Sequence, residues 1–268
     1  MYKALFAALL FSLTAHTQAA VVAIMGTGLS SSAAIEKFLT SNGHTVVYNE
    51  AAAPGAASLK GVDAVIALRT DGNDDLKNFV LNGGLLITEW TAALWAVNTA
   101  QLIEAHAGDR IEIPNSTVML TDAGKALGLG ARDMPEIYSD LGRSDVIRPF
   151  TGLGEGVEVL SALPSGEAAI ISGTAGSGYV IASSLDWADY FSSANYATRT
   201  WLLNALDVKW NTPANGTIPE PATLLLLSLG CCAFLLSRRY HDKTRHPVSQ
   251  HIPLHATLLA SPFSHHQG

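Results

Sequence analysis

Cysteine is nearly absent from this sequence of 268 residues: Cys231 and Cys232 are the only two, and both lie in an apolar run near the C-terminus. The residues ahead of that run therefore have no thiol that could form a disulfide, act as a nucleophile or bind a metal. Cysteine-dependent chemistry is excluded for the part of the chain that can form a globular domain.

Histidine is scarce in the same region. Of nine histidines, one precedes residue 20 and six follow residue 239, which leaves His44 and His106 for the middle of the chain. Neither has a His-x-His or Glu-x-x-His spacing, so the sequence predicts no transition-metal site and no cofactor. Ser30, Ser31 and Ser32 are better explained as helix caps than as nucleophiles, since no histidine base accompanies them.

Basic residues are also few. Between Ala20 and Asn215 there are 11 Lys and Arg residues against 21 Asp and Glu residues, a net charge of −10. A domain with this net negative charge is repelled by the phosphates of a nucleic-acid backbone, so nucleic acid is excluded as a partner. The segment is long enough for one domain with a sizeable core.

The N-terminus has the pattern of a secretory signal peptide. Lys3 is followed by an apolar segment at residues 4–13 and by a small-x-small cleavage site, Thr17-Gln18-Ala19. The alternative is a first core helix, but a strand pattern begins directly afterwards at Val21. We expect residues 1–19 to be removed on export, with Ala20 as the first residue of the mature chain.

An uncharged, Leu-rich run at residues 222–237 is followed at once by two arginines. As a helix it would be about 24 Å long, slightly shorter than the roughly 30 Å hydrocarbon core of a bilayer. The positive-inside bias then predicts a transmembrane helix whose C-terminal end is cytoplasmic. A buried core helix is the alternative, although such a helix rarely lacks a polar face for four turns. Residues 211–218 would be a linker and residues 240–268 a disordered tail.

Residues 219–239 resemble the PEP-CTERM sorting signal of exported Gram-negative proteins, with a Pro-Glu-Pro tripeptide, a short apolar span and a basic pair in order. The motif comprises Pro219, Glu220, Pro221, Arg238 and Arg239. The resemblance implies recognition by an exosortase, a protease-transpeptidase of the inner membrane, in cells that usually make exopolysaccharide. It implies a protein that is exported across the inner membrane, anchored there, and open to processing toward the cell surface or extracellular matrix. The family normally ends just after the basic pair, whereas this chain continues to residue 268.

Strand and helix patterns alternate through residues 20–210. The expected strands are residues 21–25, 45–48, 62–68, 85–88, 117–120, 157–160, 168–172 and 179–183. The expected helices are residues 33–42, 73–82, 91–105, 123–127 (capped by Asp122) and 192–206. This order predicts a doubly wound, flavodoxin-like α/β fold with a mostly parallel sheet and an antiparallel edge, followed by the C-terminal transmembrane helix.

Four stretches of the sequence, at residues 21–25, 62–68, 79–88 and 176–187, resemble the class I glutamine amidotransferase-like superfamily in its non-amidotransferase branches. The resemblance implies the fold. Where the catalytic branch carries a cysteine on an elbow, followed by a histidine, this chain reads Thr88-Glu89-Trp90-Thr91. The resemblance therefore argues against amidotransferase chemistry.

Candidate ligand-binding residues follow four expected strands, at the edge where open α/β sheets bind ligands. They are Gly26, Thr27, Gly28, Arg69, Asp71, Glu89, Trp90 and Asp186. The glycine segment could cradle an anion, but it lacks the third glycine of the dinucleotide fingerprint and a tight turn explains it better. For Glu89 the alternatives to a ligand role are pairing with Arg69 or capping the next helix.

Two functions remain open. The first is a non-catalytic, exported envelope or matrix protein whose α/β domain binds a small molecule, a glycan or a partner protein. The alternative is a hydrolase of extracellular carbohydrate or peptide, in which Glu89 acts with Asp71 or Asp186.

Overall fold

The computed structural model describes residues 19–26, 30–114, 117–130, 136–138, 144–188, 191 and 196–211. All of these lie in one compact unit, residues 1–214. The expected signal peptide up to residue 18, the sorting motif, its apolar run and the tail lie outside the described residues, as does the linker apart from Asn211. Among the described helices, none is both long enough and apolar enough to cross a membrane.

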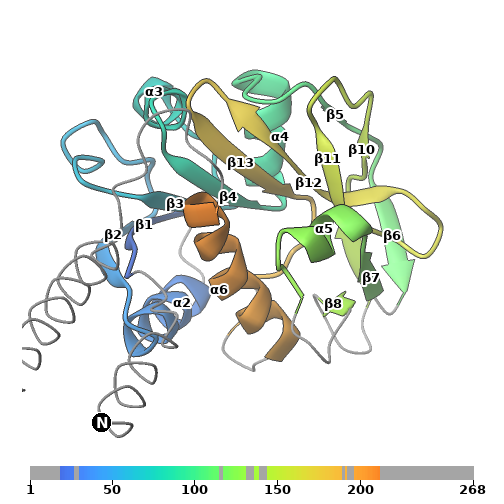
Figure 1. Cartoon of the computed structure of the whole chain (residues 1–268), viewed down its shortest axis with the longest axis horizontal. Helices are drawn as coiled ribbons and strands as arrows, with labels where there is room; N and C mark the ends of the chain where they lie inside the picture. The colour runs from blue at the N-terminus through green and yellow to red at the C-terminus, as the bar shows by residue number, and fades with distance from the viewer. Residues whose placement is uncertain are drawn as a thin grey trace, which may run out of the picture. The chain divides into compact units, whose positions relative to one another are not determined.

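The described strands form one large mixed sheet and a separate pair (Figure 1). Their bounds are β1 Val21–Gly26, β2 Thr45–Glu50, β3 Ala64–Leu68, β4 Leu85–Glu89, β5 His106–Ala107, β6 Ile111–Pro114, β7 Thr117–Leu120, β8 Glu136–Tyr138, β9 Ser144–Ile147, β10 Phe150–Thr151, β11 Glu158–Ala162, β12 Ala168–Ala175 and β13 Gly178–Ser183. Neighbours are parallel along β2-β1-β3-β4-β13 and antiparallel along β13-β12-β11-β7-β8. β10 pairs with β12 and β5, and β6 pairs with β9.

Helices cover both faces of the parallel part (Figure 1). The described helices are α2 Ser30–Ser41, α3 Asp74–Leu81, α4 Thr91–Leu94, the π-helix η1 Trp95–Thr99, α5 Asp122–Ala126, which packs on the antiparallel strands β11 and β7, and α6 Tyr196–Asn211. Side chains of consecutive β3 residues point to opposite faces: Ile66 shares a buried cluster with Leu202 of α6, and Val65 shares another with Leu76 of α3. Two covered faces explain why β1, β3 and β4 are almost uninterrupted apolar runs.

The parallel strands expected from the sequence are confirmed: β1, β2, β3 and β4 lie within two residues of their predicted bounds and pair in parallel. Turn chemistry explains the helix between β3 and β4. The Asn73 side chain accepts a hydrogen bond of 2.8 Å from the Leu76 N–H and so caps α3, while Gly83, at φ +110°, reverses the chain after its end.

Three helix predictions are wrong in detail. Ser30, Ser31 and Ser32 lie inside the first turn of α2 and do not precede it. The helix expected over residues 91–105 ends at Thr99, because a π turn closes with a 2.7 Å bond from the Ala100 N–H to the Trp95 carbonyl.

The cap of α5 is also not the predicted one. The hydroxyl of Thr121, not the carboxylate of Asp122, accepts the bond from the Gly124 N–H, at 3.2 Å. Asp122 instead occupies the first helical position, where a negative charge suits the helix dipole. Further on, α6 extends past the predicted residue 206 to Asn211, and its residues Trp201, Leu202 and Leu206 are buried.

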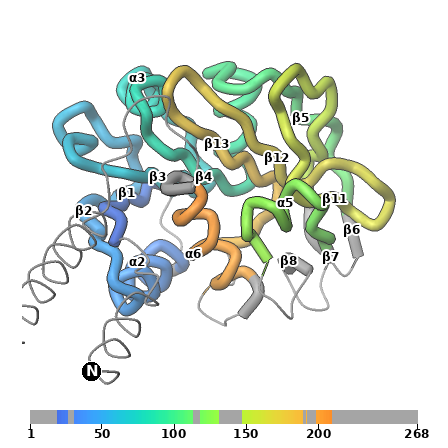
Figure 2. The backbone as a smooth tube through the Cα atoms, in the orientation of Figure 1, coloured from blue at the N-terminus to red at the C-terminus, as the bar shows by residue number. Residues whose placement is uncertain are grey.

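The antiparallel part is larger than the predicted edge. The strands expected at residues 168–172 and 179–183 form a hairpin, in which Ala175 pairs with Gly178 across a two-residue turn and Gly176 has φ +60°. However, β13 pairs in parallel with β4, so this hairpin lies in the interior of the sheet and the chain continues the sheet through β11, β7 and β8. Figure 2 shows the backbone of the hairpin between the parallel strands and β11.

Candidate functional site

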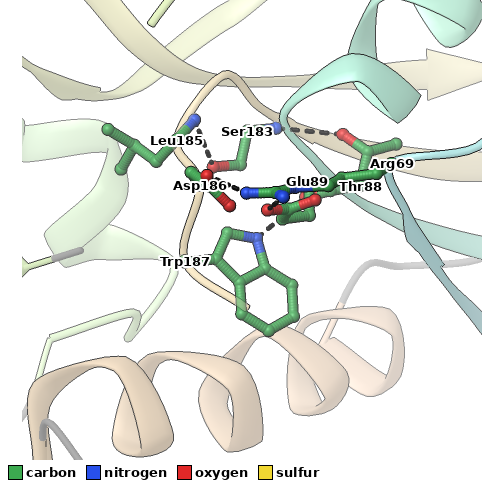
Figure 3. Close-up of polar contacts among 7 residues, drawn as sticks. All are labelled: Arg69, Thr88, Glu89, Ser183, Leu185, Asp186 and Trp187. Carbon is green, nitrogen blue, oxygen red and sulfur yellow. Dashed lines mark hydrogen bonds and ion pairs between the residues drawn. The ribbon is translucent and has the colours of Figure 1, made fainter. Parts of the chain in front are cut away.

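The carboxyl ends of β3, β4 and β13 bring charged residues together at one edge of the sheet (Figure 3). Leu68 pairs with Glu89 at the ends of the neighbouring strands β3 and β4, so Arg69 leaves its strand next to Glu89. Asp186 follows the end of β13, which pairs with the other side of β4. We call Arg69, Glu89, Trp90 and Asp186 the Arg69 cluster.

The Arg69 guanidinium lies between two carboxylates (Figure 3). Its Nε is 3.4 Å from Glu89 Oε1, and its terminal nitrogen forms an ion pair and hydrogen bond with Asp186 Oδ2. The Glu89 side chain is completely buried, whereas the side chains of Arg69 and Asp186 are each 19% exposed. The cluster is therefore closed on the Glu89 side and open to solvent at Arg69 and Asp186.

The Trp90 ring supports the guanidinium from a third direction. The central carbon of Arg69 is 4.7 Å from the ring centroid, within the range of a cation–π contact. The Trp90 ring and the Glu89 carboxylate thus both restrict the side chain of Arg69. Among the described residues, the buried Trp90 indole N–H and the buried Asp186 Oδ1 find no hydrogen-bond partner.

Two members of the cluster have unfavourable backbone conformations. Arg69 has φ +49°, and Trp90 has φ +42° with ψ −110°, in a region that side chains rarely adopt. Each such residue costs about 1–3 kcal/mol and persists only where its surroundings fix it. Trp90 joins β4 to α4, the same sharp strand-to-helix turn that carries the nucleophile in enzymes with a nucleophile elbow.

The loop after β13 is fixed against β4 by hydrogen bonds (Figure 3). The Ser183 N–H donates to Thr88 Oγ1 at 3.1 Å, and the Trp187 indole N–H donates to the Thr88 carbonyl at 3.1 Å. Trp187 is 2% exposed and makes an edge-to-face contact with Trp201 of α6, with ring centroids 5.4 Å apart. These contacts hold the loop that carries Asp186, and the neighbouring Trp187 was the local sign of them in the sequence.

Two of the sequence-predicted candidates within the described residues, Asp71 and Gly26, do not join the cluster. Asp71 is exposed, beyond the end of β3. Gly26 ends β1, and a side chain there would collide with the carbonyl of Leu68, so close packing of β1 on β3 accounts for this glycine. Thr27 and Gly28 lie outside the described residues.

The geometry disfavours the carboxylate-hydrolase alternative. A catalytic carboxylate has to reach its substrate, but Glu89 is buried and paired with Arg69, whereas Asp71 is exposed beyond the end of β3. Pairing of Glu89 with Arg69 is the alternative that the sequence left open, and the ion pair confirms it. Within the described residues, no three His, Asp or Glu side chains gather in a way that could hold a metal ion.

Similarity to known proteins lies in the fold. No protein-family model and no curated protein sequence matches the chain. A ThuA-like protein from Bacteroides uniformis is similar at TM-score 0.55 and 14% identity, over 75% of this chain and 96% of that one. A cytoplasmic protein from Salmonella typhimurium LT2 has TM-score 0.53 and 14% identity, over 69% of this chain and 98% of that one. A second cytoplasmic protein, from Salmonella typhimurium, has TM-score 0.51 and 13% identity, over 69% and 97%. At these identities the likeness shows the fold alone, and it is consistent with the resemblance to glutamine amidotransferase-like proteins.

Proposed function

We propose that this chain is an exported, exosortase-sorted protein of the cell envelope or matrix whose α/β domain binds a hydroxyl-rich ligand at the Arg69 cluster. Export is supported by the signal-peptide pattern ahead of β1, and sorting by the resemblance of residues 219–239 to a PEP-CTERM signal. Binding without catalysis is supported by the buried, paired state of Glu89.

The observation that carries the binding proposal is the strained backbone at Arg69 and Trp90. Two non-glycine residues with positive φ, on neighbouring strand ends and in mutual contact, are costly for stability alone. Such conformations concentrate at ligand sites, where they aim side chains that regular structure cannot aim. Their position at the carboxyl edge is also where open α/β sheets bind ligands.

The polar groups of the cluster indicate the ligand class. The Trp90 indole offers a donor and Asp186 Oδ1 offers an acceptor, neither of which has a partner among the described residues. A hydroxyl group can accept from the first and donate to the second. Both atoms are buried, whereas the Asp186 and Arg69 side chains are each 19% exposed, so a ligand arriving from solvent meets these two side chains first and reaches the two atoms when the exposed side chains shift. A sugar chain such as an envelope exopolysaccharide has this chemistry.

The test is calorimetric titration of the full chain, in detergent, with oligosaccharides prepared from the exopolysaccharide of the native cells. Asp186→Asn removes the charge of the carboxylate in the cluster, and Asp71→Asn is the matched control, since Asp71 is an exposed acid near the same edge. We expect Asp186→Asn to weaken binding at least tenfold and Asp71→Asn to leave it unchanged. Equal binding by both variants, or none by the native chain, would contradict the binding proposal, and release of new reducing ends would favour the hydrolase.

A further inference from the structure

Ala20, the residue before β1, lies at the amino ends of the parallel strands, the edge of the sheet opposite the Arg69 cluster. Ala20 is 2% exposed, whereas the preceding Ala19 is exposed. The Ala20 N–H donates to His44 Nδ1 at 3.2 Å, in a buried bond, and its carbonyl accepts from the Thr45 N–H at 2.9 Å. Within the described residues, burial therefore begins at the residue that follows the expected cleavage site.

The groups around the Ala20 nitrogen are acceptors and acids. His44 is 6% exposed and uses Nδ1 as an acceptor, so it is neutral in this arrangement. Asp63 Oδ2 accepts the next N–H along the chain, that of Val21, at 2.8 Å. Asp207 of α6 interacts electrostatically with His44. In the uncut chain this environment receives a single neutral N–H from Ala20.

We propose that cleavage after Ala19 completes a binding site for the freed α-amino group of Ala20, in which His44 Nδ1 accepts from the ammonium and Asp63 and Asp207 balance its charge. This inference rests on the proposed export and cleavage. Hydrolysis of the Ala19–Ala20 peptide bond adds one water, leaving a carboxylate on the released peptide and an amine on Ala20. The amine takes up a proton at neutral pH and then has three donors where the amide had one.

The site has the features that an ammonium needs. A cation is favoured by nearby carboxylates, and a neutral imidazole nitrogen supplies a hydrogen bond without repelling it. Ala19, the residue on the other side of the cleaved bond, is exposed, so the freed nitrogen lies next to solvent, which limits the cost of placing a charge there. Burial lowers the pKa of His44, which keeps its ring neutral at pH 7.

The test compares two full chains that differ by one residue. One begins at Ala20 and the other at Ala19, each released from a fusion partner by a protease that leaves no extra residue. Acylation of the α-amino group is followed at pH 7 by mass spectrometry. We expect the amine of the chain starting at Ala20 to react at least tenfold more slowly, because it is held as an ammonium against His44, whereas the amine of the longer chain projects into solvent.

Two results would overturn the inference. Equal acylation rates for the two chains would show that the amine is not held. Retention of the full protection in a His44→Phe variant starting at Ala20 would remove His44 from the site. If that variant does not fold, Asp207→Asn gives a second measurement, since loss of the carboxylate should speed acylation and an unchanged rate would contradict its part. Neither comparison depends on export, which is tested separately by the termini of the native protein.

Discussion

Removing the guanidinium of Arg69 should leave two acids without their shared cation. In Arg69→Met, the Glu89 carboxylate stays completely buried at the end of β4 and loses the group 3.4 Å away. Loss of one partner of a buried ion pair costs 3–5 kcal/mol, and the 19% exposure of Arg69 and Asp186 places this case at the low end, about 3 kcal/mol. For a domain of this size that loss lowers the melting temperature by about 6–12 °C.

Urea unfolding of a double-mutant cycle separates the lost pair from lost packing. Arg69→Met with Glu89→Leu removes the charge of both partners, so the double variant should be more stable than Arg69→Met alone. Asp71→Asn, at an exposed acid outside the cluster, should change the free energy of unfolding by less than about 0.5 kcal/mol. A loss below about 1 kcal/mol in Arg69→Met, or a double variant as unstable as the sum of the single ones, would refute the reasoning.

Three further predictions concern single positions. The free energy of unfolding of Trp90→Gly should exceed that of Trp90→Ala by about 1 kcal/mol, because glycine tolerates the φ of +42° at no steric cost. Equal urea midpoints for the two variants would argue against strain at this turn. Burial lowers the pKa of His44 from 6.5, so the unfolded chain binds a proton that the folded chain resists. Stability should therefore fall as the pH drops below about 6.5, and His44→Phe should flatten that slope in urea midpoints measured from pH 7.5 to 5.5. Glu220→Ala should block processing in a host with the cognate exosortase while export continues, and deletion of residues 240–268 should not, as read from the product sizes on immunoblots.

The sequence predicted the parallel half of the sheet well because local pattern and tertiary packing agree there. Residues of β3 and β4 are apolar on both faces, and this pattern is typical of a strand that is covered by helices on both sides of the sheet. Asn73 and Gly83 marked the ends of α3 through chemistry that acts within a few residues. Arg69, Glu89 and Trp90 were placed at one edge for the same reason, since parallel strands end together.

Features that depend on distant contacts were not predictable in this way. The apolar residues after Thr99 fit a helical pattern, yet Leu102 and Ile103 are buried without a helix, since their burial comes from tertiary packing. The central position of β13 depends on its pairing with β4, far away along the chain. The support of Asp186 through the Trp187–Thr88 hydrogen bond likewise joins residues that no local pattern connects.

The termini of the native protein test the central proposal most directly. Mass spectrometry of the chain isolated from its native cells reads both ends in one measurement. An exported, exosortase-sorted protein should begin at Ala20 and should have lost the residues that follow the Pro-Glu-Pro tripeptide. A product that still begins at Met1 and ends at Gly268 would contradict export and sorting together.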